Sequence, residues 1–258
     1  MSEKNKIFIY AGPGASDVSL KHTIHTLTSL LGAHYIIQKI TPLQIIQDEW
    51  EETASLFVMP GGSDLLYLKC LKIKGNDRIR TYVEEGGAYL GLCAGAYYAG
   101  QSVHFALNTP LEVVGARALN FFPGIVEGPI LANYDYDSYS GARIAHLHWE
   151  IGEHFPKSSV IDAFYNGGGY FVEAHAKQNT IVLANYKTAF GFKPAIVEVC
   201  HGKGKVVLSG VHWEYDPSLL DPKNPYLKNI IPKLQECHAQ TIELSKHLLA
   251  RLGLRFAK

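Results

Sequence analysis

Residues 6–92 alternate between short runs rich in β-branched and aromatic residues and longer segments in which apolar residues recur with helical spacing. The strand-like runs cover residues 6–10, 35–40, 56–59 and 88–92, and the helical segments cover residues 17–31 and a stretch through Arg78 to Glu85. Strands that alternate with helices predict an α/β fold with a mostly parallel central sheet covered on both faces. The connections between these strands are expected to be right-handed.

The second half of the chain has a different pattern. Between about residues 111 and 211 it contains many short β-like runs and only weak helical signals, and residues 197–209 form a predicted hairpin around the turn HGKG. Residues 229–255 have the apolar face of an amphipathic helix packed on the sheet. Because no repeat, low-complexity stretch or linker interrupts the pattern, we expect one domain over residues 1–258, with additional β hairpins in its second half.

Charge and cysteine content limit the functional classes. The chain has 24 Lys and Arg against 24 Asp and Glu and no basic run, which gives no electrostatic support for a nucleic-acid or anionic-membrane partner. No segment reaches the ~18 consecutive apolar residues of a membrane span, and the first residues predict a polar lead into a strand rather than a signal peptide. The four cysteines form no CxxC pair. We therefore expect a cytoplasmic protein with no cofactor and no metal that acts on a small molecule.

The segment Gly91-Leu92-Cys93-Ala94-Gly95 follows a predicted strand and precedes a run of small residues. This spacing predicts a nucleophile elbow with cysteine in place of serine, because side chains at the two glycine positions would clash in so sharp a turn. A thiol at the start of a helix is also favoured as thiolate. The alternative is that Cys93 is a small buried residue in an ordinary strand–helix turn.

A nucleophilic cysteine needs a base and a third group that orients the base. The tripeptide His-Trp-Glu occurs twice, at residues 148–150 and 212–214. The second copy follows the predicted strand KVVLS and a glycine, so His212 is expected at the carboxyl edge of the sheet, where ligands gather in α/β folds. We therefore predict His212 as the base and Glu214 as its orienter.

The first copy allows another interpretation. His146, His148 and Glu150 alternate along a predicted strand and would share one face, as the ligands of a metal site could. A half-exposed strand face with ordinary hydrogen bonds is the interpretation that we favour.

An oxyanion site is predicted at Met59-Pro60-Gly61-Gly62-Ser63-Asp64, which ends a buried strand. Glycines leave backbone N–H groups uncovered, and those of Gly61 and Gly62 could join the N–H of Ala94 around a reacting oxygen. The alternative is a plain turn in which Ser63 or Asp64 caps a helix.

Three motifs thus stand in order, PGG at 60–62, GLCAG at 91–95 and GVHWE at 210–214, and this order resembles the class I glutamine amidotransferase superfamily. Across most of the chain, CAGAYYAG at 93–100 and FYNGGGYF at 164–171 are more similar to the biotin–protein ligase N-terminal domain family. The resemblance implies a flavodoxin-like three-layer sandwich with a Cys–His–Glu catalytic triad. Carried over by motif, it implies a nucleophile, base and orienter at Cys93, His212 and Glu214, and an oxyanion region at Gly61, Gly62 and Ala94.

Two positions depart from the amidotransferase pattern. Tyr97 stands where those enzymes usually carry glutamine, and Trp213 stands where proline usually follows the histidine. Both changes weaken the case for glutamine as substrate and leave the triad intact. The chain also lacks the Gly-rich, Arg-rich adenylate-binding motif of a ligase, so we do not expect a biotin ligase by itself.

Substrate contacts are predicted at Tyr97 and at the glycine-rich stretch that contains Asn166, Gly167 and Gly168, because a run of glycines allows backbone to approach a ligand. Residues 133–140 (NYDYDSYS) are interpreted as a surface loop in preference to a substrate rim.

The leading functional hypothesis is a cysteine-dependent amidohydrolase or amidotransferase-like enzyme acting on an amide or a related small molecule. The alternatives are a non-catalytic binding or regulatory module on the same fold, or a peptidase-type thiol hydrolase. The sequence does not identify a protein partner.

Overall fold

The computed structural model describes residues 4–150 and 160–256. Within these residues the largest sheet has nine strands, β1 (Lys6–Tyr10), β2 (Ile36–Ile40), β3 (Ala54–Met59), β4 (Ala88–Leu92), β8 (Arg143–Trp149), β9 (Val160–Tyr165), β11 (Thr180–Thr188), β12 (Gly191–His201) and β13 (Gly204–Ser209), in the order β2-β1-β3-β4-β13-β12-β11-β8-β9. A four-stranded sheet contains β5 (Gly100–Phe105), β6 (Val113–Ala116), β7 (Phe122–Gly128) and β10 (Tyr170–Phe171).

The large sheet is mixed rather than mostly parallel. Strands β2, β1, β3, β4 and β13 pair in parallel, as the alternation in residues 6–92 predicts. From β13 outward through β12, β11, β8 and β9 every pair is antiparallel. The reason is visible in the predicted hairpin at 197–209, which the structure confirms as β12 and β13: so short a connection returns the chain only in the antiparallel sense. Gly202 supplies the left-handed turn residue, with φ +58°.

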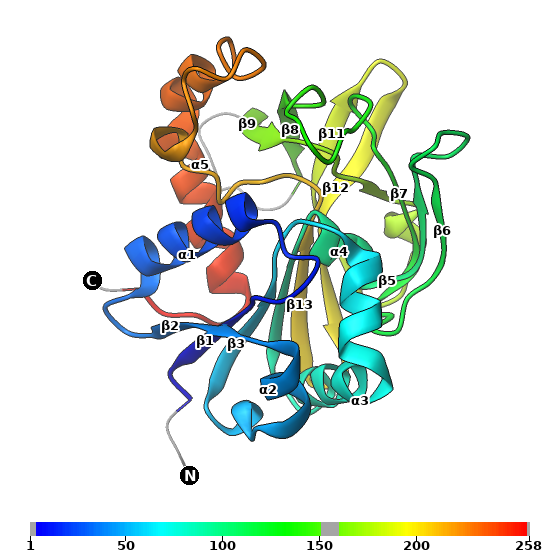
Figure 1. Ribbon diagram of the computed structural model, residues 1–258, viewed down its shortest axis with the longest axis vertical. Helices are drawn as coiled ribbons and strands as arrows, with labels where there is room; N and C mark the ends of the chain where they lie inside the picture. The colour runs from blue at the N-terminus through cyan, green and yellow to red at the C-terminus, as the bar shows by residue number, and fades with distance from the viewer. Residues whose placement is uncertain (1–3, 151–159, 257–258) are drawn as a thin grey trace.

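Helices cover both faces of the parallel part of the sheet, as Figure 1 shows. The helices are α1 (Asp17–Leu31), α2 (Pro42–Gln47), α3 (Asp64–Glu84), α4 (Ala94–Tyr98) and α5 (Ile231–Arg251), with 3₁₀ turns at Trp50–Glu52, Ala174–Ala176 and Pro217–Leu219. Side chains alternate along each strand: Ile7 and Ile9 pack in one core with α1 and α5, whereas Phe8 and Tyr10 pack in the other core with α2 and α3. The predicted amphipathic helix at 229–255 is α5, which packs beside α1 although the two are far apart in sequence (Figure 1).

None of the helices in the described residues is long and apolar enough to cross a membrane. The carboxyl ends of β1, β3, β4 and β13 meet at one edge of the sheet, since these strands are parallel. That edge is where an open α/β sheet leaves room for a ligand.

Candidate functional site

Cys93 lies on the sharp turn that joins β4 to α4. Its φ of +48° and ψ of −103° are sparsely populated values for a residue with a side chain, so surrounding contacts must hold them. The Cys93 N–H donates to Ser209 O at 2.8 Å, and the Gly95 N–H donates to Pro60 O at 3.1 Å. A Cβ at residue 95 would lie 2.1 Å from Met59 O, and one at Gly91 would lie 2.6 Å from Gly95 O. The turn therefore has the elbow geometry that the G-x-C-x-G spacing predicts.

His212 and Glu214 form a buried pair in the turn that follows β13. His212 Nδ1 lies 2.8 Å from Glu214 Oε1, and the two residues are 4% and 1% exposed. The His212 N–H donates to Phe164 O at 2.8 Å, and Thr26 Oγ1 of α1 donates to Glu214 O at 2.7 Å. Because Glu214 occupies Nδ1, the ring's other nitrogen remains for a second partner.

Cys93 and His212 line the same cavity, and Cys93 is one of the groups that shift the pKa of His212. Burial by itself lowers the pKa of His212, but the negative charges of Glu214 and Cys93 and the hydrogen bonds to them outweigh it and raise the pKa to about 10. The Cys93 Sγ also lies 3.7 Å from Asn166 O. The structure thus brings together the three side chains that the sequence assigns to a triad.

The predicted oxyanion residues divide into two groups. The N–H of Gly61 donates to Ser19 Oγ at 2.8 Å, so this group is already occupied, which corrects the prediction that it faces a reacting oxygen. Gly61 instead makes room for the imidazole, because a Cβ there would lie 2.8 Å from His212 Cε1. The N–H groups of Gly62 and Ala94 donate to no acceptor among the described residues. The sequence contains no motif that singles out Ser19.

The turn after β3 also tests the alternative that Ser63 or Asp64 caps a helix. Ser63 occupies the N-cap position of α3, but its side chain makes no capping hydrogen bond. Asp64 is the first residue of α3 and pairs with Arg117 Nε at 2.6 Å.

A cavity of about 450 Å³ opens over Cys93. Besides Cys93 and His212, it is lined by Ser16, Val18, Ser19, Gly61, Gly62, Tyr134, Tyr136, Asp137, Ser138, Tyr139, Asn166, Tyr215, Asn224, Pro225 and Tyr226. Five of these lining residues belong to residues 133–140. This segment is a surface loop, as we expect, and it also forms a rim of the cavity. Its high content of tyrosine was the available signal.

Asn166 lines the cavity, but the other predicted substrate contacts lie outside the lining. Tyr97 is 4% exposed, and its hydroxyl donates to Gly167 O at 3.1 Å. Gly167 has φ +83° and packs against the Tyr134 ring, and a Cβ at Gly168 would lie 1.6 Å from Gly210 O. Tyr97, Gly167 and Gly168 therefore pack beneath the residues that line the cavity. This corrects the prediction that they contact the substrate directly.

The strand face of His146, His148 and Glu150 contains ordinary contacts. His146 Nδ1 lies 2.5 Å from Asp162 Oδ1, and Glu150 accepts a hydrogen bond from Asn185. Among residues 4–150 and 160–256 no group of three His, Cys, Asp or Glu side chains is arranged to hold a metal ion.

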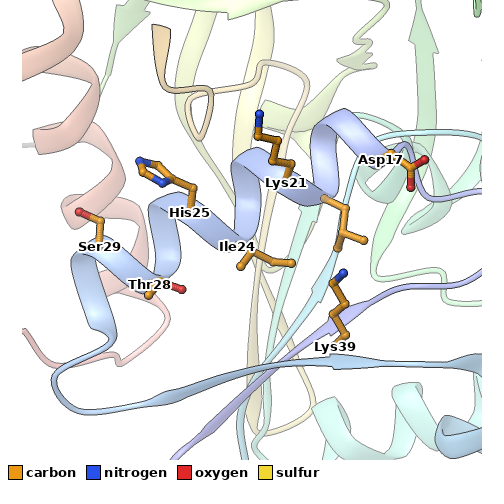
Figure 2. A pocket seen from close by; sticks show the side chains of 8 residues that line it. Asp17, Lys21, Ile24, His25, Thr28, Ser29 and Lys39 are labelled. Carbon is orange, nitrogen blue, oxygen red and sulfur yellow. The ribbon is translucent and has the colours of Figure 1, made fainter. Parts of the chain in front are cut away.

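A separate groove of about 610 Å³ runs along α1 beside β2. Figure 2 shows its side chains, which include Asp17, Lys21 and His25 from α1 and Lys39 from β2. It contains charges of both signs and none of the predicted site residues. The cavity over Cys93 is therefore the candidate site.

The fold and the site define an α/β protein with a cysteine on a strand–helix turn beside a buried histidine–glutamate pair. The chain belongs to the biotin–protein ligase N-terminal domain family, whose model matches residues 5–258.

Two relatives show how this domain occurs. The biotin–protein ligase of Schizosaccharomyces pombe is 35% identical over 254 residues, which cover 98% of this chain and 38% of the ligase. An uncharacterized protein of Chlamydia muridarum is 34% identical over 252 residues, which cover 96% of this chain and 95% of that protein. The chain therefore matches only a part of the ligase but nearly all of the chlamydial protein.

Among solved structures, a ThuA-like protein from Bacteroides uniformis aligns with a TM-score of 0.52 and 14% identity, covering 89% of this chain and 90% of that one. At that identity the likeness concerns the fold alone.

Proposed function

We propose that this protein is a cysteine-dependent amidohydrolase or amidotransferase-like enzyme that uses Cys93, His212 and Glu214. The observation that carries the proposal is the buried His212–Glu214 pair, 2.8 Å apart, beside a cysteine on a strained turn at the base of a cavity. Strained backbone, a paired base and an open cavity meet at few places in a protein, and their coincidence favours catalysis over packing.

The proposed chemistry begins from a Cys93 thiolate and a His212 imidazolium, and the raised pKa of His212 supports the protonated imidazole. The thiolate attacks the amide carbonyl carbon, and the oxyanion is held by the N–H groups of Gly62 and Ala94. The C–N bond then breaks, and the leaving nitrogen takes the proton of His212. Neutral His212 next removes a proton from water or an amine, which attacks the thioester and restores the thiolate and the imidazolium.

We also propose that the fold is flavodoxin-like. The parallel strands follow the order β2-β1-β3-β4-β13, which is the flavodoxin order 2-1-3-4-5 when the strands are numbered along the parallel part. The antiparallel strands would then be an extension of this sheet.

A second candidate is a non-catalytic module, and the family match favours it, because the chain corresponds to 38% of a longer ligase in one relative. Such a module would need the cavity but no activated thiol. A peptidase-type thiol hydrolase would use the same three residues and differ only in substrate.

Iodoacetamide labelling of each cysteine against pH, read by mass spectrometry, separates the candidates. Cys200 is exposed and serves as the internal reference for an ordinary thiol. We expect labelling of Cys93 to stay fast well below the free-thiol pKa of about 8.5 and to slow in His212→Ala. Labelling of Cys93 that follows the profile of an ordinary thiol in both proteins would refute the enzyme and leave the binding module.

A further inference from the structure

Apart from the turn around Cys93, the lining of the cavity is rich in aromatic rings and contains a carboxylate. Gly62 lines the cavity beside Cys93, whereas residues 134–139 contribute three tyrosines and Asp137. No lysine or arginine is among the described residues that line the cavity. A ligand with a positive charge toward the tyrosine rings and Asp137 therefore fits this lining.

Two tyrosines in the lining of the cavity are well exposed. Tyr136 and Tyr226 are 45% and 52% exposed, which is high for aromatic residues beside a cavity. Tyr134 packs edge-on against Tyr136, with ring centroids 4.9 Å apart and an angle of 81°. Edge-on packing leaves the face of one ring available, and the negative face of an aromatic ring attracts cations.

The carboxylates add to this preference. Asp135 holds the loop, because its carboxylate accepts hydrogen bonds from the Asp137 N–H and the Ser138 hydroxyl. Asp137 itself lines the cavity, is exposed, and forms no ion pair with any residue in 4–150 or 160–256. In the proposed resting state the thiolate and Glu214 already outnumber the single positive charge of His212. Asp137 makes the cavity more negative still.

We propose that the substrate of this site is an amide that carries an ammonium or quaternary ammonium group, held by Tyr136, Tyr226 and Asp137. This inference rests on the proposed function for the reaction, but the recognition of the cation can be tested without it. An anionic substrate would meet Asp137 and find no lysine or arginine in the lining, and the one cationic side chain there, His212, is already paired with Glu214. Free glutamine, whose α-carboxylate needs such a partner, is therefore disfavoured.

Isothermal titration calorimetry with benzyltrimethylammonium, benzyl alcohol and benzoate tests the cation site on the whole protein. We expect the ammonium probe to bind at least about tenfold more tightly than the alcohol, and benzoate to bind most weakly. Tyr136→Leu should weaken the ammonium probe about three- to tenfold, whereas Tyr136→Phe, which keeps the aromatic face, should change it less than about twofold. Asp137→Asn should weaken it about two- to fivefold. Asp77→Asn on the exposed surface of α3 is the matched control and should have no effect.

Equal binding of the ammonium and the alcohol, or an unchanged affinity in Tyr136→Leu, would overturn this inference. The cysteine labelling profile separates its failure from that of the enzyme. If Cys93 is labelled fast at low pH but the ammonium probe is not preferred, the proposed substrate class is wrong and the proposed hydrolase stands. If the ammonium probe is preferred but Cys93 is labelled as an ordinary thiol, the proposed hydrolase is wrong and the cation site stands.

Discussion

The tripeptide His-Trp-Glu occurs at 148–150 and at 212–214, and the structure places the two copies in opposite environments. The tryptophan is buried in the same core in both, 5% exposed at Trp149 and 2% at Trp213. In the first copy the chain is the extended strand β8 and its end, with His148 against the Phe192 ring. In the second, the chain turns after β13 and buries the histidine and glutamate as a pair 2.8 Å apart.

The difference shows that backbone conformation decides what this tripeptide does. In a strand, residues two apart have their side chains on the same face. The residues are spaced about 6.6 Å along the strand, which holds the two side chains apart. A turn brings the same side chains together, and burial then strengthens their interaction because less water screens it. The two copies are therefore natural controls for each other.

The largest expected effect comes from removing each histidine. His212→Ala should lower the rate of Cys93 acylation by p-nitrophenyl acetate at neutral pH by about 10²–10³-fold, because the thiolate loses its partner. His148→Ala should change it less than about twofold. Both rates are measured from the released nitrophenolate, and circular dichroism controls for folding. Comparable rates in the two variants would show that the second copy has no special role.

Removing the carboxylates should have a smaller effect. Glu214→Gln should lower acylation about 10- to 100-fold, because the amide no longer fixes the ring or stabilises its charge. The His212 pKa, about 10 in the wild type, should fall, since Glu214 is the main cause that raises it. NMR titration of the ring measures this change. Glu150→Gln is the matched control. A fall in the acylation rate of equal size in Glu150→Gln would contradict the assignment of Glu214 as the residue that orients His212.

The third prediction concerns His22 of α1, which stacks on Tyr215 with centroids 4.1 Å apart and accepts from the Asp216 N–H through Nδ1. Burial, and after it the positive charge of nearby His212, lower the pKa of His22 to about 4. Its folded pKa lies below the unfolded value of about 6.5, so the unfolded chain binds more protons in between.

The stability that neutral His22 contributes is thus complete above about pH 6.5 and is lost as the pH falls toward 4, by an amount on the order of 2 kcal/mol. His22→Asn keeps an acceptor for Asp216 and should flatten this part of the profile. Urea unfolding between pH 4 and 7 measures it, and the exposed His175→Asn should leave the profile unchanged. Parallel profiles for wild type and His22→Asn would show that His22 is not the group responsible.

The smallest effect should come from the tryptophans, which the two copies share. Trp149→Phe and Trp213→Phe should each lower the free energy of unfolding by about 1–2 kcal/mol, because both lie in one core. Thermal unfolding measures the loss. We expect similar losses in stability for the two tryptophan variants. The two copies would then differ only in the effect of their histidine and glutamate on acylation. A much larger loss at one tryptophan would show that the two copies also differ in packing.

Much of the frame followed from local sequence. Alternating apolar runs predicted the strands at 6–10 and 88–92, and the spacing around Cys93 predicted its strained turn, because both depend on neighbours a few residues apart. The hairpin at 197–209 followed from its turn residues for the same reason.

Local sequence did not predict which residues of the site face the cavity and which pack beneath it. The Gly61 N–H donates to Ser19, which lies 42 residues away in the sequence, and the Tyr97 hydroxyl donates to Gly167, which lies 70 residues away. Local sequence does not specify such contacts. The tyrosine rim likewise became part of the cavity only through packing.

The sequence by itself determined the parallel strands, the cysteine turn and the family, since these rest on short-range geometry and on residue identity. Only the tertiary structure decided that the sheet continues as an antiparallel half, and that one of two identical tripeptides pairs its histidine and glutamate beside the thiol. The physical reason is that burial and side-chain distance are properties of the whole packed chain, whereas a tripeptide specifies neither.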